Sequence, residues 1–294
     1  MTSLLLLTGT GVAATLLLVL IVLIMNRRRP KSNVPPGVVV LYQIGRGNFA
    51  PSISPFPLKL ETFLRMTKIP YMNDHSGKFS SKGKTPWMEY NGKPIADSQF
   101  CIEYLKKEKE VDVNIHLNKD EISIAKAFQR LTEENLYWTM CIESFGGDVS
   151  AVSSIIPYTG LKLWLTVKFL QRVIKQETWG HGMGRHTPDE VWEIAVHDMT
   201  AISNFLGVKK FFMGDEPCEV DCVLFGMLVM IIYNMPGSKH QKFVTEALGN
   251  LVSYCERMKN KYWPDWNDKL LPSPTYKDDS DKIYWHKTDN STHS

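Results

Sequence analysis

The hydrophobic and polar positions change pattern several times along the chain. Residues 4–25 form an uncharged run that consists mostly of Leu, Val, Ile and Ala. Residues 38–107 alternate between short apolar segments of strand length and segments whose apolar residues recur every three or four positions. From Lys119 to Lys259 the helical period dominates, and after Trp266 the chain becomes polar. The pattern predicts a membrane segment, a small mixed region of strands and helices, a helical region and a polar tail.

The apolar run is long enough to cross a bilayer. Leu4–Met25 contains 22 residues without a charge. At about 1.5 Å per residue a helix of this length reaches about 33 Å, whereas a hydrocarbon core is about 30 Å thick. A cleaved signal peptide is the alternative. The length of the run, the lack of a basic residue before Leu4 and the absence of a small-x-small cleavage site favour a permanent anchor.

Positive charge follows the run and predicts its orientation. Arg27–Arg29 and Lys31 lie directly after the expected span, so the positive-inside rule places the rest of the chain in the cytoplasm. The five cysteines are odd in number and widely scattered, which is unlike a secreted disulfide framework and agrees with a reducing compartment. Residues 26–37, which include several prolines, are expected to be a linker. The pattern leaves open which membrane is involved.

Residues 38–110 predict a small α+β domain. The expected order is β-α-β-β-β-α, and Asn91-Gly92 is the strongest short hairpin turn in the sequence. The predicted elements are a strand at Val38–Tyr42, a helix at Pro55–Thr67, a strand beginning at Tyr71–Met72, hairpin strands at Trp87–Tyr90 and Lys93–Ala96, and a helix at Ser98–Lys107.

Residues 118–266 predict an all-helical domain, and residues 267–294 a disordered tail. The sequence Thr187-Pro188-Asp189-Glu190 is a capping box with proline at the first helical position. Tryptophans at helical positions, including Trp164 and Trp179, are expected in the core. The predicted helices are Lys119–Phe145, Leu161–Thr178, Pro188–Leu206, Glu219–Tyr233 and Lys239–Lys259.

Three short polar motifs lie at the ends of predicted elements of the α+β domain. Ser54 precedes the first helix, where amide dipoles stabilise an anion; its other role is to cap that helix. Thr85-Pro86 precedes the third strand, a place where proline is commonly cis. Asp97-Ser98 begins the second helix, where its hydroxyl and amides could hold a small carboxylate.

Other chemistries are disfavoured. Gly45-x-Gly47-x-x-Ala50 fits a dinucleotide fingerprint, but the prolines that follow prevent the helix the motif requires from starting there. The histidines and cysteines lack the spacing of a zinc site, so no metal is expected; His181–His186 is either an anion site or an interhelical turn. A net charge of +3 is too balanced for a nucleic-acid-binding protein.

The order and spacing of these motifs resemble a cytosolic glutathione transferase. Phe211–Asp215 followed by Glu219–Asp221 resembles the capping stretch of that superfamily's helical half. Within it, the chain resembles the failed axon connections group, which is related to the metaxins. The strings that carry this resemblance are SPFPLKLETFLR from Ser54, GKTPWMEYN from Gly83, HGMGR from His181, YCER from Tyr254 and WPDW from Trp263.

The resemblance implies a thioredoxin-like domain followed by a helical domain, with glutathione as ligand. Thr85, before Pro86, would give backbone hydrogen bonds to the cysteinyl part of glutathione. Asp97 and Ser98 would hold its γ-glutamyl end, and Ser54 would take the place of the catalytic serine or cysteine. Residues 75–84 are too few for the usual second helix, which helps hold the glycyl end, and Cys218 stands where a hydroxyl cap is usual.

Two functions follow from the resemblance. The first is a membrane-anchored binding or adaptor protein with weak or no catalysis, acting through protein partners or as a homodimer. The second is an active transferase that conjugates glutathione to electrophiles.

Overall fold

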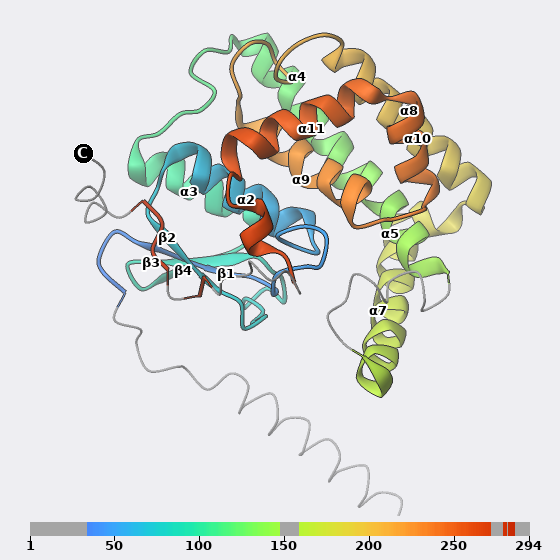
Figure 1. Ribbon diagram of the computed structural model, residues 1–294, viewed down its shortest axis with the longest axis horizontal. Coiled ribbons are helices and arrows are strands. Elements are labelled where there is room, and N and C mark those ends of the chain that lie inside the picture. Colours follow the sequence, from blue (N-terminus) through green and yellow to red (C-terminus); the bar gives the residue numbers. More distant parts are fainter. Residues whose placement is uncertain (1–33, 148–158, 272–278, 281, 286–294) are drawn as a thin grey trace, which may run out of the picture. The chain divides into compact units, whose positions relative to one another are not determined.

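The computed structural model describes residues 34–147, 159–271, 279–280 and 282–285. Gly37–Ser294 forms one compact unit, separate from the unit that contains residues 1–36. The expected anchor at residues 4–25 and most of the expected linker fall outside the described ranges. No helix within those ranges combines the length and hydrophobicity that crossing a bilayer requires. Every labelled element in Figure 1 belongs to the Gly37–Ser294 unit.

A mixed sheet with the strand order β2-β1-β3-β4 organises the N-terminal half. β1 runs parallel to β2 and antiparallel to β3, and β3 is antiparallel to β4. Asn91 and Gly92 both have positive φ and form the tight β3–β4 turn that their sequence predicted. The strands are β1 (Val39–Tyr42), β2 (Tyr71–Asp74), β3 (Trp87–Tyr90) and β4 (Lys93–Ile95).

Helices α2 (Pro55–Thr67) and α3 (Ser98–Lys109) cover one face of the sheet (Figure 1). Their apolar residues pack against Val39 and Leu41 of β1 and Met88 of β3, which are fully buried. Alternate strand residues point to this face because the side-chain period of a strand is two. The element order β-α-β-β-β-α confirms the predicted thioredoxin-like half.

The connection between β2 and β3 is short and irregular. Residues 75–84, all of them described, form turns and bends and no helix. Gly77 donates its backbone N–H to the carbonyl of Gln43, and the indole of Trp87 donates to the carbonyl of Lys78 at 2.9 Å. A loop therefore replaces the second helix that is usual in the transferases the sequence resembles.

The C-terminal half is helical, as predicted. Two of its helices have the expected bounds, but the expected helix Lys239–Lys259 is divided at Leu248, which has φ −122° and ψ 51°. Gly249 follows, and glycine has a low helix propensity. The elements are α4 (Lys119–Arg130), the π-helical η1 (Leu131–Leu136), α5 (Tyr137–Gly146), α7 (Gly160–His181), the 3₁₀ turn η2 (Met183–Arg185), α8 (Pro188–Leu206), α9 (Glu219–Tyr233), α10 (Lys239–Ala247), α11 (Gly249–Tyr262) and η3 (Trp266–Lys269).

The prediction that Trp164 and Trp179 lie in the core is wrong. Trp164 and Trp179 are 49% and 60% exposed. α7 packs against α5 and η2, and it buries only Val167 and Thr178 completely. Most of this helix therefore faces solvent.

α9 is the central helix of the helical half, and a buried carboxylate fixes its start. Asp221 accepts hydrogen bonds from the backbone N–H groups of Phe212 and Cys218 and from the hydroxyl of Tyr254, all within 2.8 Å. The bond from Cys218 satisfies one of the amides that the start of a helix leaves unpaired, and the bond from Phe212 joins the preceding turn to the same carboxylate. The carboxylate of Asp221 thus compensates for the thiol at the cap position of Cys218.

The two halves meet where α2 crosses α9. Gly226 lies at the crossing, and a Cβ atom there would approach the carbonyl oxygen of Pro55 to 2.6 Å and the amide nitrogen of Lys59 to 3.4 Å. Only glycine lets the backbones come this close. Because Pro55 immediately follows Ser54, this contact also positions the residue that the sequence singled out.

The C-terminal segment departs from the expectation of disorder at the residues that are described. Asp279 and Tyr284 are buried, and Tyr284 forms an antiparallel bridge with Tyr71 of the edge strand β2. The two rings also stack, with centroids 4.7 Å apart. The polar composition of this segment predicted disorder, because composition alone does not indicate that individual residues such as Asp279 and Tyr284 are buried against the rest of the chain.

Gly226→Ala should destabilise the chain. The added methyl group meets backbone atoms that cannot move without shifting α2, and overpacking of this kind costs about 1–3 kcal/mol. Urea unfolding measures the effect. Gly180→Ala on α7 is the matched control, because its Cβ meets no atom within 4 Å; it should leave stability unchanged or raise it by up to about 1 kcal/mol. Equal unfolding midpoints for the two variants would contradict the proposed close contact.

Candidate functional site

Ser54 lies at the N-terminus of α2 with its hydroxyl uncommitted to the helix. Its backbone is extended (φ −136°, ψ 141°), as an N-cap residue requires, but its side chain makes no capping hydrogen bond to the amides of α2, all of which are described. Pro55 occupies the first helical position. The side chain is half-buried, and the positive end of the helix dipole favours an anion nearby.

Thr85 precedes β3, and the Thr85–Pro86 peptide bond is cis, as predicted. The hydroxyl oxygen of Thr85 is buried and has no hydrogen-bond partner in the described part of the chain. An unpaired buried hydroxyl is costly, so this atom could take a hydrogen bond from an added ligand.

Asp97 and Ser98 begin α3. The carboxylate of Asp97 accepts from the backbone N–H of Gln99 at 3.1 Å and caps the helix, as expected of this position. Ser98 is 5% exposed. The motif therefore starts α3. A ligand could be held there only by the groups that capping does not use, such as the second carboxylate oxygen of Asp97.

The sheet register brings the three motifs to one end of the sheet. Tyr42, the last residue of β1, pairs with Trp87, the first residue of β3. Ile95, the last residue of β4, pairs with Met88. The loop to Ser54, the Thr85–Pro86 bond and the start of α3 all extend from this same end.

A buried polar cluster, here called the Lys59 cluster, lies beside the motifs and joins both halves. The ammonium of Lys59 donates to Glu133 at 2.6 Å and to the side-chain oxygen of Gln99 at 2.7 Å. Gln99 in turn donates to Glu219 at 2.8 Å and accepts from Gln129 at 2.6 Å. This arrangement fixes the residue next to Ser98. No sequence motif predicted this cluster, because its members come from five helical elements, α2, α3, α4, η1 and α9.

A second buried cluster surrounds Glu61 on α2. Arg46 binds both oxygens of this carboxylate at 2.9 and 3.0 Å, and its Nη2 also lies 2.5 Å from Asp279. Gln43 and Tyr71 donate to Glu61 as well, at 3.0 and 3.1 Å. Burial opposes ionisation, but the guanidinium groups of Arg46 and Arg65 outweigh it and lower the pKa of Glu61 to about 2.

The five cysteine thiols are expected to be poor nucleophiles. All five cysteines are described, buried and free of disulfides. Burial raises the pKa of each, to about 12 for Cys101 and Cys141, and it also does so for Cys218, Cys222 and Cys255. A thiol with a raised pKa is a poor nucleophile at neutral pH.

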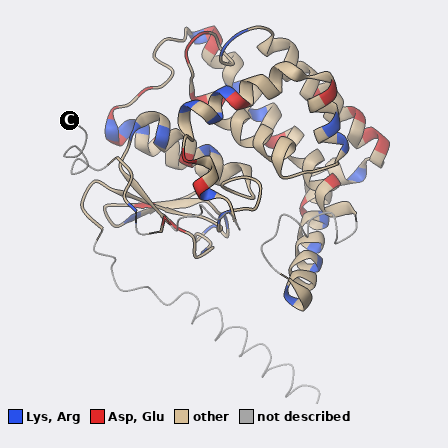
Figure 2. Cartoon of the chain, viewed as in Figure 1, with Lys and Arg blue, Asp and Glu red and all other residues tan. Residues whose placement is uncertain are grey.

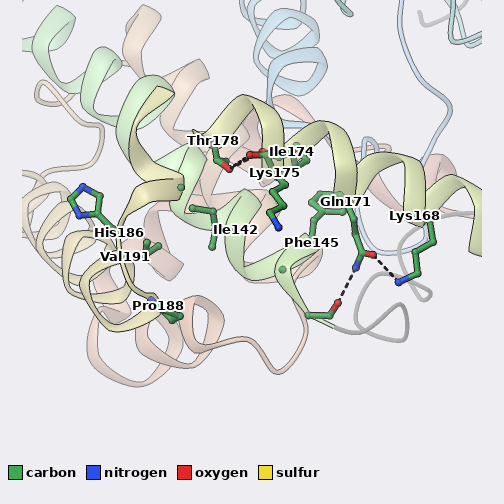
Figure 3. Close-up of a pocket in the computed structure, with 13 residues that line it drawn as sticks. Ile142, Phe145, Lys168, Gln171, Ile174, Lys175, Thr178, His186, Pro188 and Val191 are labelled. Carbon is green, nitrogen blue, oxygen red and sulfur yellow. Dashed lines mark hydrogen bonds between the residues drawn. The ribbon is translucent and has the colours of Figure 1, made fainter. Parts of the chain in front are cut away.

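The His181–His186 stretch forms an interhelical turn. Gly184 packs against the end of α7, where a Cβ atom would lie 2.8 Å from the backbone nitrogen of Trp179. His186 lines a pocket of about 530 Å³ together with Lys168, Gln171 and Lys175 (Figure 3). Throughout the described ranges, no group of three or more His, Cys, Asp or Glu side chains could hold a metal ion.

Comparisons with known proteins agree with this geometry. Residues 55–150 match the glutathione S-transferase N-terminal domain, and residues 195–258 match the glutathione S-transferase C-terminal domain. The chain is 30% identical to failed axon connections of Drosophila melanogaster over 81% of this chain and 61% of that protein. It is also 30% identical to isoprene-epoxide–glutathione S-transferase of a Rhodococcus strain, over 72% of this chain and 94% of the enzyme.

The chain belongs to the glutathione S-transferase family. Within that family it is similar to failed axon connections and to the metaxins. Metaxin-2 of Mus musculus is 24% identical over 80% of this chain and 93% of its own length. Among solved structures, a Ceriporiopsis subvermispora glutathione S-transferase in complex with glutathione matches with a TM-score of 0.55 and 18% identity, over 76% of this chain and 97% of that one. This structural likeness supports the fold. The chain spans less than two thirds of failed axon connections, so that protein's activity does not transfer with the family.

Glu61→Gln should be strongly destabilising. It leaves Arg46 and Arg65 buried beside a neutral amide, and breaking a buried ion pair costs about 3–5 kcal/mol. Glu134→Gln is the control, because its pair with Arg130 is exposed and contributes at most about 1 kcal/mol. Denaturant unfolding at neutral pH measures both.

The effect of Glu61→Gln should depend on pH. The folded-state pKa is about 2 and the ordinary value is 4.5, so the carboxylate contributes stability above pH 4.5 and loses it as the pH falls toward 2. The stability difference between wild type and Glu61→Gln should therefore shrink across this range. A difference that stays constant would contradict the role assigned to the ionised carboxylate.

Proposed function

We propose that this chain is a membrane-anchored binding or adaptor protein on a glutathione-transferase fold, with weak or no catalysis. The observation that carries this proposal is the loop at residues 75–84. In the transferases that the sequence resembles, the helix at this place helps to hold the glycyl end of glutathione. With a loop there, the ligand has fewer fixed contacts, and a weakly held thiol reacts slowly because its position is poorly defined.

The remaining half-site supports glutathione as a weak ligand. We assign Thr85 and Pro86 to its cysteinyl part and Asp97 and Ser98 to its γ-glutamyl end. The unpaired hydroxyl of Thr85 favours this assignment. Against tight binding, the carboxylate of Asp97 already caps α3, and Ser98 is almost fully buried.

The alternative is an active transferase in which Ser54 stabilises the glutathione thiolate. The uncommitted hydroxyl of Ser54 favours it. Lowering a thiol pKa from about 9 to about 6.5 requires about 3.4 kcal/mol of preferential stabilisation. A hydrogen bond to a charged group gives about 1.5–3 kcal/mol and a helix dipole up to about 2 kcal/mol, so the requirement is within reach.

The membrane anchor and the cellular side are part of the proposal. The uncharged run Leu4–Met25 and the basic residues after it support a single span with the Gly37–Ser294 unit facing the cytoplasm. Protein partners are part of the same proposal, because the similarity to failed axon connections and the metaxins is what suggests a binding role in place of catalysis. A homodimer is the simplest such assembly.

Two assays on purified chain separate the alternatives. Calorimetric titration should detect weak glutathione binding that Ser98→Ala reduces several-fold, whereas Ser123→Ala, an exposed serine on α4, should leave it unchanged. Conjugation of 1-chloro-2,4-dinitrobenzene should proceed at the uncatalysed rate in wild type and Ser54→Ala alike. Turnover that depends on Ser54 would establish the transferase instead.

If wild type, shown to be folded by circular dichroism, binds no glutathione at millimolar concentration, the assignment of Thr85, Pro86, Asp97 and Ser98 fails. The adaptor function would then rest on protein partners alone.

A further inference from the structure

α7 presents an unusual solvent-exposed face. Large apolar side chains on it are exposed, with Phe169 66% and Leu161 71% accessible. Residues separated by three or four positions lie on the same side of a helix. Six exposed residues of α7 have this spacing and form a stripe, which has apolar residues at both ends and cations in the middle. The stripe consists of Leu161, Leu165, Lys168, Arg172, Lys175 and Trp179, with Trp164 and Phe169 beside it; these eight residues are called the α7 surface.

The charge of the α7 surface has one sign. Lys168, Arg172 and Lys175 lie at its centre, and all three are exposed. Glu177 is the only acidic residue of α7, and its place in the helical repeat falls on the opposite side of the stripe. Figure 2 shows basic residues along α7.

The positive charge of the α7 surface favours an anionic partner over a second copy of the chain. Two copies of the α7 surface would bring like charges together without an acidic group on either side to offset them. An anionic partner has the matching charge. The apolar side chains point to a lipid surface, because exposed Trp, Phe and Leu combined with Lys and Arg on one helix are typical of helices that lie in a membrane interface.

The positions of the tryptophans support the same occupant. Trp164 and Trp179 lie toward opposite ends of α7, and tryptophan favours the headgroup level of a bilayer. The helix is 22 residues long, so a flat contact would spread its cations over many lipid headgroups. We propose that the α7 surface binds the face of an anionic membrane. This contact involves α7, which contributes none of the residues assigned to the glutathione half-site; those residues lie just before α2 and β3 and at the start of α3.

The test uses the full-length chain mixed with lipid nanodiscs of phosphatidylcholine alone or with phosphatidylserine. Overall binding is uninformative because the chain carries its own apolar N-terminal run. Hydroxyl-radical footprinting instead reports each side chain. Oxidation of Trp164, Phe169 and Trp179 should fall several-fold when phosphatidylserine is present, while Phe100, which is 54% exposed on α3, should be oxidised equally in both lipids.

Charge reversal supplies the second arm. The triple variant Lys168→Glu, Arg172→Glu and Lys175→Glu should restore oxidation of the α7 surface, since each cation near an anionic bilayer strengthens binding by about fivefold. The control variant Lys84→Glu, Lys107→Glu and Lys242→Glu changes the net charge equally at exposed positions elsewhere, and should keep the protection.

Three results would overturn the proposal. Equal oxidation in the two lipids would remove the anionic membrane as partner. If the α7 side chains of the triple Glu variant stay protected from oxidation, Lys168, Arg172 and Lys175 do not contribute to membrane binding. Protection in lipid-free detergent that rises with protein concentration would identify a second copy as the occupant.

Discussion

The position of α2 depends on one buried carboxylate. Glu61 is completely buried, and an unpaired charge in the interior is far too costly to retain. Its partners come from the loop after β1, from β2 and from one turn further along α2. Asp279 completes the arrangement by pairing with the same guanidinium of Arg46. Because each charge needs the others, the first helix, the edge strand and the C-terminal segment hold one another in place.

This constraint reaches the candidate site through α2. The helix begins directly after Ser54, contacts α9 through Gly226 and carries Lys59 into the cluster that fixes Gln99 beside Ser98. The fold therefore keeps Ser54, Thr85 and Asp97-Ser98 at one end of the sheet, although a loop replaces the second helix that is usual in the transferases. The same framework can present surfaces to a membrane or a protein without any change at Ser54, which is why a binding function is compatible with a retained transferase architecture.

Local chemistry made much of the fold predictable. The Asn91-Gly92 turn, the capping box at Thr187 and the apolar run of α9 each specify their own structure within a few residues. Long-range pairing is different. Arg46 and Asp279 are 233 positions apart, and nothing near either residue indicates its partner. The motifs at Ser54, Thr85 and Asp97 were found from their order along the chain, whereas Lys59 and Glu61 look like solvent-facing residues until the helices that bury them are placed.

The central claim is that charges from the C-terminal segment help to hold α2. Hydrogen exchange of the α2 amides, compared between the full chain and a chain ending at Leu271, tests it most directly. Removing Asp279 and Tyr284 takes away one of the two carboxylate partners of Arg46 and uncovers β2. Residues 55–67 and 71–74 should therefore exchange faster, while α9 retains its protection. Unchanged exchange in α2 and β2 would contradict the account.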